Sequence, residues 1–209
     1  MLKATAQTPG PPPRRARSET KQKIIEAALD TLKNSGYRGS TAREISRRGG
    51  FNQALIFYHF GSITDLLLAA LDETSARRME AYETAVAGAN TVEELIEVAS
   101  RIYREDLASG HITVLSEMIA GSLSDPELGS EIVARLDPWI DFARLAIEKV
   151  LPDALRSLAS SEEIAYAVVA FYLGIDLLTH LQPGRHEPGK LLDAAERTAP
   201  LLGALAGSR

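Results

Sequence analysis

The sequence contains no cysteine and no apolar run long enough to span a membrane. Without cysteine, structural disulfides and thiolate metal sites are excluded. The longest apolar run extends from Ile164 to Ile175 and ends at Asp176, short of the roughly 20 residues that a spanning helix needs. We therefore expect a buried helix there. Because Lys3 and several prolines stand where a secretory signal has its apolar core, we expect a cytoplasmic protein.

The sequence also lacks the motifs of catalysis and of metal binding. It has no serine elbow, no phosphate-binding glycine loop and no paired histidines with a glutamate, so we expect no enzymatic activity. His111 and His186 have no partners at ligand spacing. We therefore expect neither a metal site nor a cofactor.

Positive charge is scarce overall but concentrated near the N-terminus. The chain has a net charge of −5. Residues 1–60 hold 11 Lys or Arg against 4 Asp or Glu, a net +7, whereas residues 61–209 hold 12 against 24, a net −12. The basic part is suited to neutralising DNA phosphates, although a chance imbalance of solvated faces gives the same numbers.

The most informative segment is TAREISRRGGFNQALIFYHF, residues 41–60, which has the pattern of a helix-turn-helix. Thr41 is placed to cap the first helix, with Glu44 reaching back to the cap amide. Gly49 and Gly50 permit the turn, and Asn52 is the expected cap of the second helix. The early positions of that helix would then face base edges in a major groove. The alternative is an ordinary helical hairpin with core aromatics.

The remaining pattern is helical, and no strand pattern is present. We expect one helix with its cap at Ser18 and its end at Gly36, and a second that runs from a Ser62–Asp65 capping pair to about Ala87. Thr91 and Glu94 repeat the capping device. Further helices are expected over 92–109, 112–122, 126–151, 162–181 and 188–206, with breaks at Gly110, Gly121, Pro152 and Pro183–Gly184 and a kink or split at Pro138.

These elements predict an all-α protein with three parts. Residues 1–17, rich in proline and arginine, are expected to form a disordered basic arm. Such an arm either follows DNA or is a leader without a specific role. Residues 18–64 form a three-helix DNA-binding module with the helix-turn-helix. Residues 65–209 form a larger helical ligand-binding and dimerisation domain.

From Lys23 to Leu68 the sequence resembles the TetR family of transcriptional regulators, with the first helix, TAREIS, the glycine turn and IFYHF in family order. The resemblance implies a homodimer that binds a pseudo-palindromic DNA operator and represses transcription until a small-molecule effector releases it. The DNA contacts that it implies are Thr41, Arg43, Arg47, Asn52, Gln53, Ala54, Leu55, Phe57, Tyr58 and His59.

The sequence departs from the family pattern at four positions. Ala54 and Leu55 replace glycine and threonine and suit thymine methyl groups, Phe57 replaces a tyrosine, and Ile63 replaces a lysine that would reach phosphate. Fewer phosphate contacts leave more of the affinity to basic side chains elsewhere. Those expected to supply it are Arg14, Arg15, Arg17, Arg43, Arg47 and Arg48.

Aromatic and polar residues of the C-terminal part are candidates for an effector cavity. They are Tyr103, His111, Met118, Trp139, Phe142, Tyr172 and Asp176, with Phe171 and His180 as further candidates. Plain core packing is the competing interpretation for each of them. Asp176 and His180 are four residues apart and suit a ligand or, alternatively, a polar pair at a dimer seam.

The helices expected over 162–206 carry more apolar surface than a terminal pair needs, which predicts a homodimer interface there; the alternative is that they cap their own domain. We expect the helix that starts at Ile63 to transmit the effector signal to the DNA-binding module. An alternative function is a DNA-binding adaptor controlled by a protein partner rather than by a small ligand.

Overall fold

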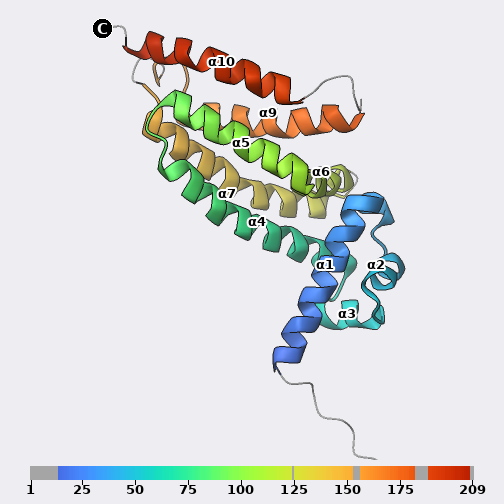
Figure 1. Ribbon diagram of the computed structural model, residues 1–209. Helices are drawn as coiled ribbons and strands as arrows, with labels where there is room; N and C mark the ends of the chain where they lie inside the picture. The colour runs from blue at the N-terminus through green and yellow to red at the C-terminus, as the bar shows by residue number, and fades with distance from the viewer. Residues whose placement is uncertain (1–13, 124, 153–155, 182–187, 208–209) are drawn as a thin grey trace, which may run out of the picture.

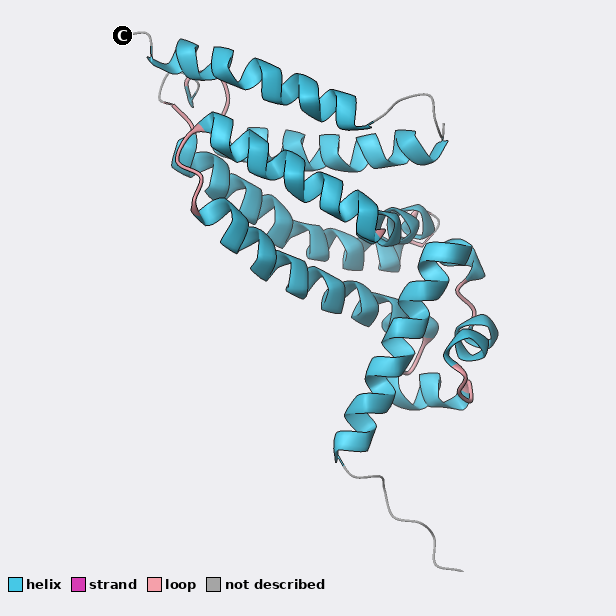
Figure 2. Cartoon of the chain, in the orientation of Figure 1, coloured by secondary structure: helices cyan, strands magenta, loops and turns pink. Residues whose placement is uncertain are grey.

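The computed structural model describes residues 14–123, 125–152, 156–181 and 188–207, and these residues form helices with no strand (Figures 1 and 2). The predicted all-α fold is confirmed. The helices are α1 (Arg14–Gly39), α2 (Ala42–Gly49), α3 (Ala54–Phe60), α4 (Ile63–Ala87), α5 (Val92–Ser109), α6 (His111–Ser122), α7 (Pro126–Val150), α9 (Ser161–Leu181) and α10 (Pro188–Gly207). Helices α1 to α3 form a small module beside the larger bundle of α4 to α10 (Figure 1).

Short polar side chains start four of these helices. Oxygens of Thr41, Ser62, Thr91 and Asp125 each accept the backbone N–H three residues on, at 3.0 to 3.2 Å. The caps predicted at Ser62 and Thr91 are confirmed, but their acidic partners do not bind the cap amides: Asp65 accepts the Ser62 hydroxyl, and Glu94 accepts the N–H of Asn90. Half of the pair predicted at Thr41 is wrong, because the Glu44 carboxylate binds arginines one turn further on instead of the cap amide.

Helix α1 is longer than predicted at both ends. It begins at Arg14 and not at Ser18, so Arg14 to Arg17 belong to a helix, because alanine and arginine favour helix. The rest of the predicted arm, residues 1–13, lies outside the described residues. At the other end Gly36 takes a left-handed conformation (φ 69°) and the chain turns helical again as far as Gly39. The amide of Tyr37 donates to Glu117 Oε2 on α6 at 2.8 Å, which stabilises this kink.

The core of the module continues into the bundle. Ile24, Ala28 and Leu32 of α1 pack with Ile45 of α2 and Ile56 of α3. The same cluster includes residues of α4, α6 and α7, among them Leu66, Leu67, Ala70, Leu71, Val114, Met118 and Leu128. No break in the core therefore falls at the predicted boundary between residues 64 and 65.

The ends of the C-terminal helices follow the predicted breaks closely. Helix α6 ends at Ser122, one residue after Gly121, which lies against the ring of Tyr37. Helix α7 runs through Pro138, so the predicted split does not occur there. The predicted break at Pro183–Gly184 lies outside the described residues. Helix α9 packs along α7, and α10 packs along α5.

Within the described ranges, no single helix is long and apolar enough to cross a membrane. Only α3 and α4 taken together, bent by 66° at their junction, satisfy that test by length and composition.

Candidate nucleic-acid interface and cavity

The chain turns tightly between α2 and α3. Gly50 adopts the left-handed conformation (φ 62°, ψ 44°), and its N–H donates to the carbonyl of Ser46, which ends α2. Asn52 Oδ1 then accepts the N–H of Ala54 at 2.9 Å, so Asn52 binds the first turn of α3 as the sequence predicted. The two helices are thereby held as a helix-turn-helix on one side of α1 (Figure 1).

The residues predicted to contact DNA lie on and around α2 and α3. Eight of them are exposed, namely Thr41, Arg43, Arg47, Asn52, Gln53, Ala54, Phe57 and Tyr58. Phe57 and Tyr58 are 49% and 59% exposed, which is unusual for rings of this size and typical of a surface that a partner covers. Leu55 and His59 are only partly exposed, and Leu55 packs against the module core.

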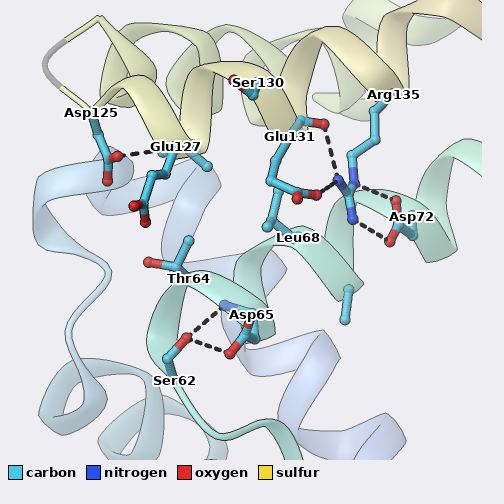
Figure 3. A pocket seen from close by; sticks show the side chains of 12 residues that line it. Ser62, Thr64, Asp65, Leu68, Asp72, Asp125, Glu127, Ser130, Glu131 and Arg135 are labelled. Carbon is cyan, nitrogen blue, oxygen red and sulfur yellow. Dashed lines mark hydrogen bonds and ion pairs between the residues drawn. The ribbon is translucent and has the colours of Figure 1, made fainter.

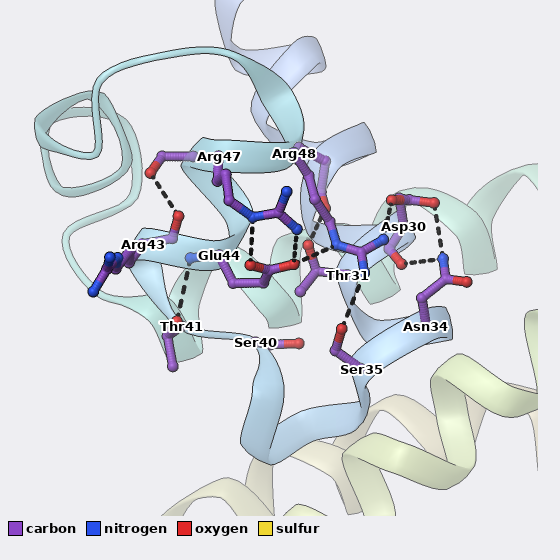
Figure 4. Close-up of polar contacts among 12 residues, drawn as sticks. Asp30, Thr31, Asn34, Ser35, Ser40, Thr41, Arg43, Glu44, Arg47 and Arg48 are labelled. Atoms are coloured by element: carbon purple, nitrogen blue, oxygen red, sulfur yellow. Dashed lines mark hydrogen bonds and ion pairs between the residues drawn. The ribbon is translucent and has the colours of Figure 1, made fainter.

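The arginines of α2 differ in what they bind. Arg47 and Arg48 both donate to the Glu44 carboxylate, and Arg48 also binds Asp30 Oδ2 at 2.7 Å and Ser35 Oγ at 3.1 Å (Figure 4). Hydrogen bonds from these two guanidinium groups lower the pKa of Glu44 to about 2. Arg48, a predicted phosphate contact, is therefore engaged inside the module.

Arg43 and Arg47 differ from Arg48 in their availability. The structure gives the exposed Arg43 side chain no ion pair within the described ranges. Arg47 is 66% exposed and bound to Glu44 alone, so it is able to exchange that carboxylate for a phosphate.

Basic residues of α1 lie over the aromatic side chains of α3. The Arg17 guanidinium is 5.4 Å from the centroid of the Tyr58 ring, and Lys21 Nζ is 5.4 Å from that of Phe60. Burial, Arg17 and Lys21 lower the pKa of His59. Lys21 was missed as a member of this basic edge, although its position four residues after Arg17 places both on one helix face.

A cavity of about 490 Å³ lies between α4, α5, α6, α7 and α9. Of the predicted ligand residues, His111, Trp139, Phe142 and Tyr172 line it. Tyr82 of α4 also lines it; its ring centroid is 5.6 Å from that of Trp139. Tyr82 was missed, although it follows Leu71 by three helical turns on the same face of α4.

The other three predicted ligand residues lie elsewhere. Tyr103 packs behind Tyr172, with ring centroids 5.2 Å apart, in a separate apolar cluster. Met118 belongs to the core shared with the DNA-binding module. Asp176 is buried, its Oδ2 accepts a hydrogen bond from Ser116 Oγ, and it is not part of the cavity lining. The structure therefore places none of these three at the cavity wall, because the rotation of each helix directs them into packing between helices.

One wall of the cavity is backed by a buried carboxylate. Asp106 of α5 is fully buried; it binds Arg78 and the hydroxyl of Tyr82, both on α4, and the hydroxyl of Tyr172 on α9 at 2.6 Å. Burial raises the pKa of Tyr82 to about 12 and also raises that of Tyr172. The two phenols are therefore neutral near pH 7, and the Asp106 charge is paired with Arg78.

His111 is the remaining titratable group of the cavity wall. It is 6% exposed, and burial, assisted by Arg78 and Lys33, lowers its pKa to about 3. The imidazole is thus neutral near pH 7. A neutral imidazole carries one nitrogen that donates and one that accepts a hydrogen bond.

A second hollow, of about 760 Å³, is open to solvent between the start of α4 and α7 (Figure 3). Its charged residues are Asp65, Asp72, Asp125, Glu127, Glu131 and Arg135. Arg135 binds Asp72 at 2.7 Å and Glu131 at 2.6 Å, so part of the acidic charge is compensated. Across the described part of the chain, no three His, Cys, Asp or Glu side chains are grouped to hold a metal ion.

Comparison with known proteins agrees with this architecture. Residues 24–70 match the model of the family described as bacterial regulatory proteins, tetR family. An uncharacterized HTH-type transcriptional regulator of Mycobacterium tuberculosis is 24% identical over 192 residues, which cover 90% of this chain and 93% of the relative. The HTH-type transcriptional repressor AcnR of Corynebacterium glutamicum is 35% identical over 63 residues, 30% of this chain and 34% of its own length.

Solved structures share the fold over most of the chain. A transcriptional regulator from Saccharomonospora viridis in complex with choline superposes with a TM-score of 0.70 at 19% identity, covering 86% of this chain and 94% of its own. The regulator FadR from Bacillus subtilis in complex with stearoyl-CoA gives 0.67 at 16% identity, covering 85% and 96%.

Proposed function

The chain belongs to the tetR family of bacterial regulatory proteins, and from this premise we propose that it is a repressor that binds a pseudo-palindromic operator as a homodimer and is released by a small molecule. It is a DNA-binding transcriptional regulator and not an enzyme, as expected from the sequence. We place its action in the cytoplasm, where bacterial DNA lies.

The observation that carries the proposal is the exposed face of α3. Gln53 is suited to paired hydrogen bonds with adenine, and Ala54 and Phe57 are suited to contact thymine methyl groups. Arg43 and Arg47 are exposed on α2 and Tyr58 is exposed on α3, and their guanidinium and hydroxyl groups are suited to binding phosphate. An exposed recognition helix with apolar and polar base-reading groups inside a basic edge supports major-groove binding.

The proposed homodimer is supported by an uncovered apolar face on α9 and α10. Large apolar side chains there are between 47% and 65% exposed, namely Tyr166, Phe171, Leu177, Leu178, Leu191 and Leu201. A second copy would cover them in a four-helix bundle, and its two-fold axis would set the spacing of the two recognition helices.

The proposed release by an effector is supported by the cavity and by its connection to α4. Relatives of the same fold have been solved with choline and with stearoyl-CoA. In this chain Arg78 and Tyr82 join α4 to Asp106 at the cavity wall, and α4 leads directly from the DNA-binding module. An effector that changes this arrangement would change the spacing of the recognition helices, with a typical coupling of about 1 to 3 kcal/mol. The cavity favours control by a small molecule over control by a protein partner.

Selection from a random pool of DNA duplexes tests the proposal. We expect enrichment of a two-fold symmetric sequence and loss of that specificity in Gln53→Ala. In Arg43→Ala we expect the slope of the logarithm of the DNA-binding constant against the logarithm of the salt concentration to become smaller by about 0.9. Arg101→Ala removes the same charge from an exposed position on α5 and serves as the control. A pool without enrichment, or an equal change in the salt dependence of binding in Arg43→Ala and Arg101→Ala, would refute DNA recognition through this face.

A further inference from the structure

Among the described residues that line the cavity none is charged, and the wall has two chemically different parts. Helices α5 and α7 supply aliphatic side chains such as Leu95, Ile96, Ala146 and Val150. The other part is aromatic, with Tyr82, Trp139, Phe142 and Tyr172 beside His111. A molecule that fills this space therefore has to be mainly apolar.

One polar atom of this wall lacks a partner. Nδ1 of His111 is buried and makes no hydrogen bond within the described ranges, whereas the hydroxyls of Tyr82 and Tyr172 are bound to Asp106. Buried polar atoms in folded proteins nearly always have a partner, and an unpaired one at a cavity wall points to a ligand or a water. His111 is 6% exposed and lies against Trp139, with ring centroids 6.4 Å apart, so its place in the wall is fixed by packing.

Charged ligands lack a counterpart here. Among the described residues an anionic group would find no free cation at the wall, because Arg78 is bound to Asp106 and Lys33, which is not part of the lining, donates to the carbonyl of Ser109 at 2.9 Å. A cationic group would find rings but no free carboxylate, because Asp106 already binds Arg78 and two phenols. Transferring an unpaired charge from water into an apolar cavity is strongly unfavourable.

We propose that the cavity binds an uncharged, mainly aliphatic molecule with a single hydrogen-bonding group, and that this group binds Nδ1 of His111. This inference rests on the proposed effector role of the cavity. It adds the chemical class of the effector and the residue that selects it.

Four probes with the same eight-carbon chain test the class: 1-octanol, octane, octanoate at pH 8 and octyltrimethylammonium. Trp139 is the only tryptophan and lines the cavity, so its fluorescence reports binding to the full-length protein. We expect 1-octanol to bind about tenfold more tightly than octane, the gain of one hydrogen bond, and both charged probes to bind more weakly. Tighter binding of a charged probe, or binding of none of the four, overturns the inference.

Variants locate the hydrogen bond. His111→Phe keeps an aromatic ring without the nitrogens, and we expect 1-octanol to bind it no more tightly than octane; His111→Gln restores a hydrogen-bonding group and should recover part of the difference. An undiminished preference for 1-octanol in His111→Phe contradicts the assignment.

A second pair of variants avoids dependence on the folding of His111 variants. Ala146→Phe fills the aliphatic part of the cavity and should abolish binding of 1-octanol and of octane, whereas Ala134→Phe, exposed on the same helix, should not. Equal binding to both variants would place the probes outside this cavity.

Operator release, measured separately with labelled DNA, distinguishes the two proposals. If 1-octanol binds the cavity with the expected preference but leaves operator affinity unchanged, the ligand class stands and the effector role fails. If a charged probe binds better and releases the DNA, the effector role stands and the ligand class fails.

Discussion

At the scale of single residues, His111 makes the stability of the fold sensitive to acid. Its pKa is about 3 in the folded chain and near 6.5 in the unfolded chain. Between these two pH values the imidazole is protonated in the unfolded chain and neutral in the folded chain. This contribution to stability is complete above pH 6.5 and is lost as the pH falls toward 3. At pH 5 the loss amounts to about 2 kcal/mol. Urea unfolding of wild type and His111→Phe at pH 7 and pH 5 measures it, and equal losses in both proteins would contradict the pKa.

Arg48 gives a second prediction at this scale. Because its guanidinium binds Asp30, Glu44 and Ser35, we expect Arg48→Ala to lower the melting temperature slightly and to leave the salt dependence of DNA binding unchanged. Thermal unfolding and DNA titration in salt measure the two effects. If Arg48→Ala reduces the slope of DNA-binding affinity against salt concentration as much as Arg43→Ala does, Arg48 exchanges its partners for phosphate.

Residue roles could be predicted from the sequence where they depend on neighbours along one helix. Asn52 is such a case, since the chain itself places it at the start of α3. The ion pair between Glu44 and Arg47 could also have been predicted, since the two residues are three apart on one helix. The sequence pattern equally fits a Glu44 that binds the cap amide of Thr41, and this second arrangement was the one predicted. The binding of Asp106 to Tyr172, 66 residues later, depends on how two helices meet and has no local signal.

At the scale of elements, α6 connects the cavity with the DNA-binding module. It carries His111 at the cavity, and Gly121, its penultimate residue, lies against the ring of Tyr37 from α1. A Cβ at Gly121 would lie 2.5 Å from a ring carbon of Tyr37. We expect Gly121→Ala to destabilise the fold by about 1 to 3 kcal/mol, because the ring has to move.

The matched control is Gly129→Ala on α7, where the nearest atom to an added Cβ is the Ser122 carbonyl oxygen at 3.8 Å. Alanine there should be neutral or stabilise by up to about 1 kcal/mol, since alanine favours helix. Thermal unfolding compares the two variants. A Gly121→Ala protein as stable as Gly129→Ala would show that Tyr37 is not held against α6.

The end of α6 was predicted to within one residue, because glycine usually interrupts a helical pattern and α6 ends at Ser122, directly after Gly121. The packing of the Tyr37 ring on Gly121, 84 positions later in the chain, has no local signal in the sequence. The starts of α4 and α5 were predicted correctly because their caps are read from adjacent residues.

At the scale of the whole molecule, the all-α architecture and the helix-turn-helix followed from local patterns. The cavity did not, because its wall combines residues from five helices whose rotations are fixed only by packing. The exposure of the apolar face on α9 and α10 is also a property of the folded chain. The sequence indicated surplus apolar residues there, and the structure shows which of them, including Phe171 and Leu178, are left uncovered.

That face gives the prediction on which the proposed operator geometry depends. Phe171 of α9 is 53% exposed, and an aspartate there would be desolvated without a partner in a dimer. We expect Phe171→Asp to sediment as a monomer and to lose most of its operator affinity, because one recognition helix binds only one half-site. Val133→Asp makes a comparable change at a 58% exposed position on α7 and should remain dimeric. A Phe171→Asp protein that sediments as a dimer would move the interface away from α9 and α10, and with it the basis for the spacing of the two recognition helices.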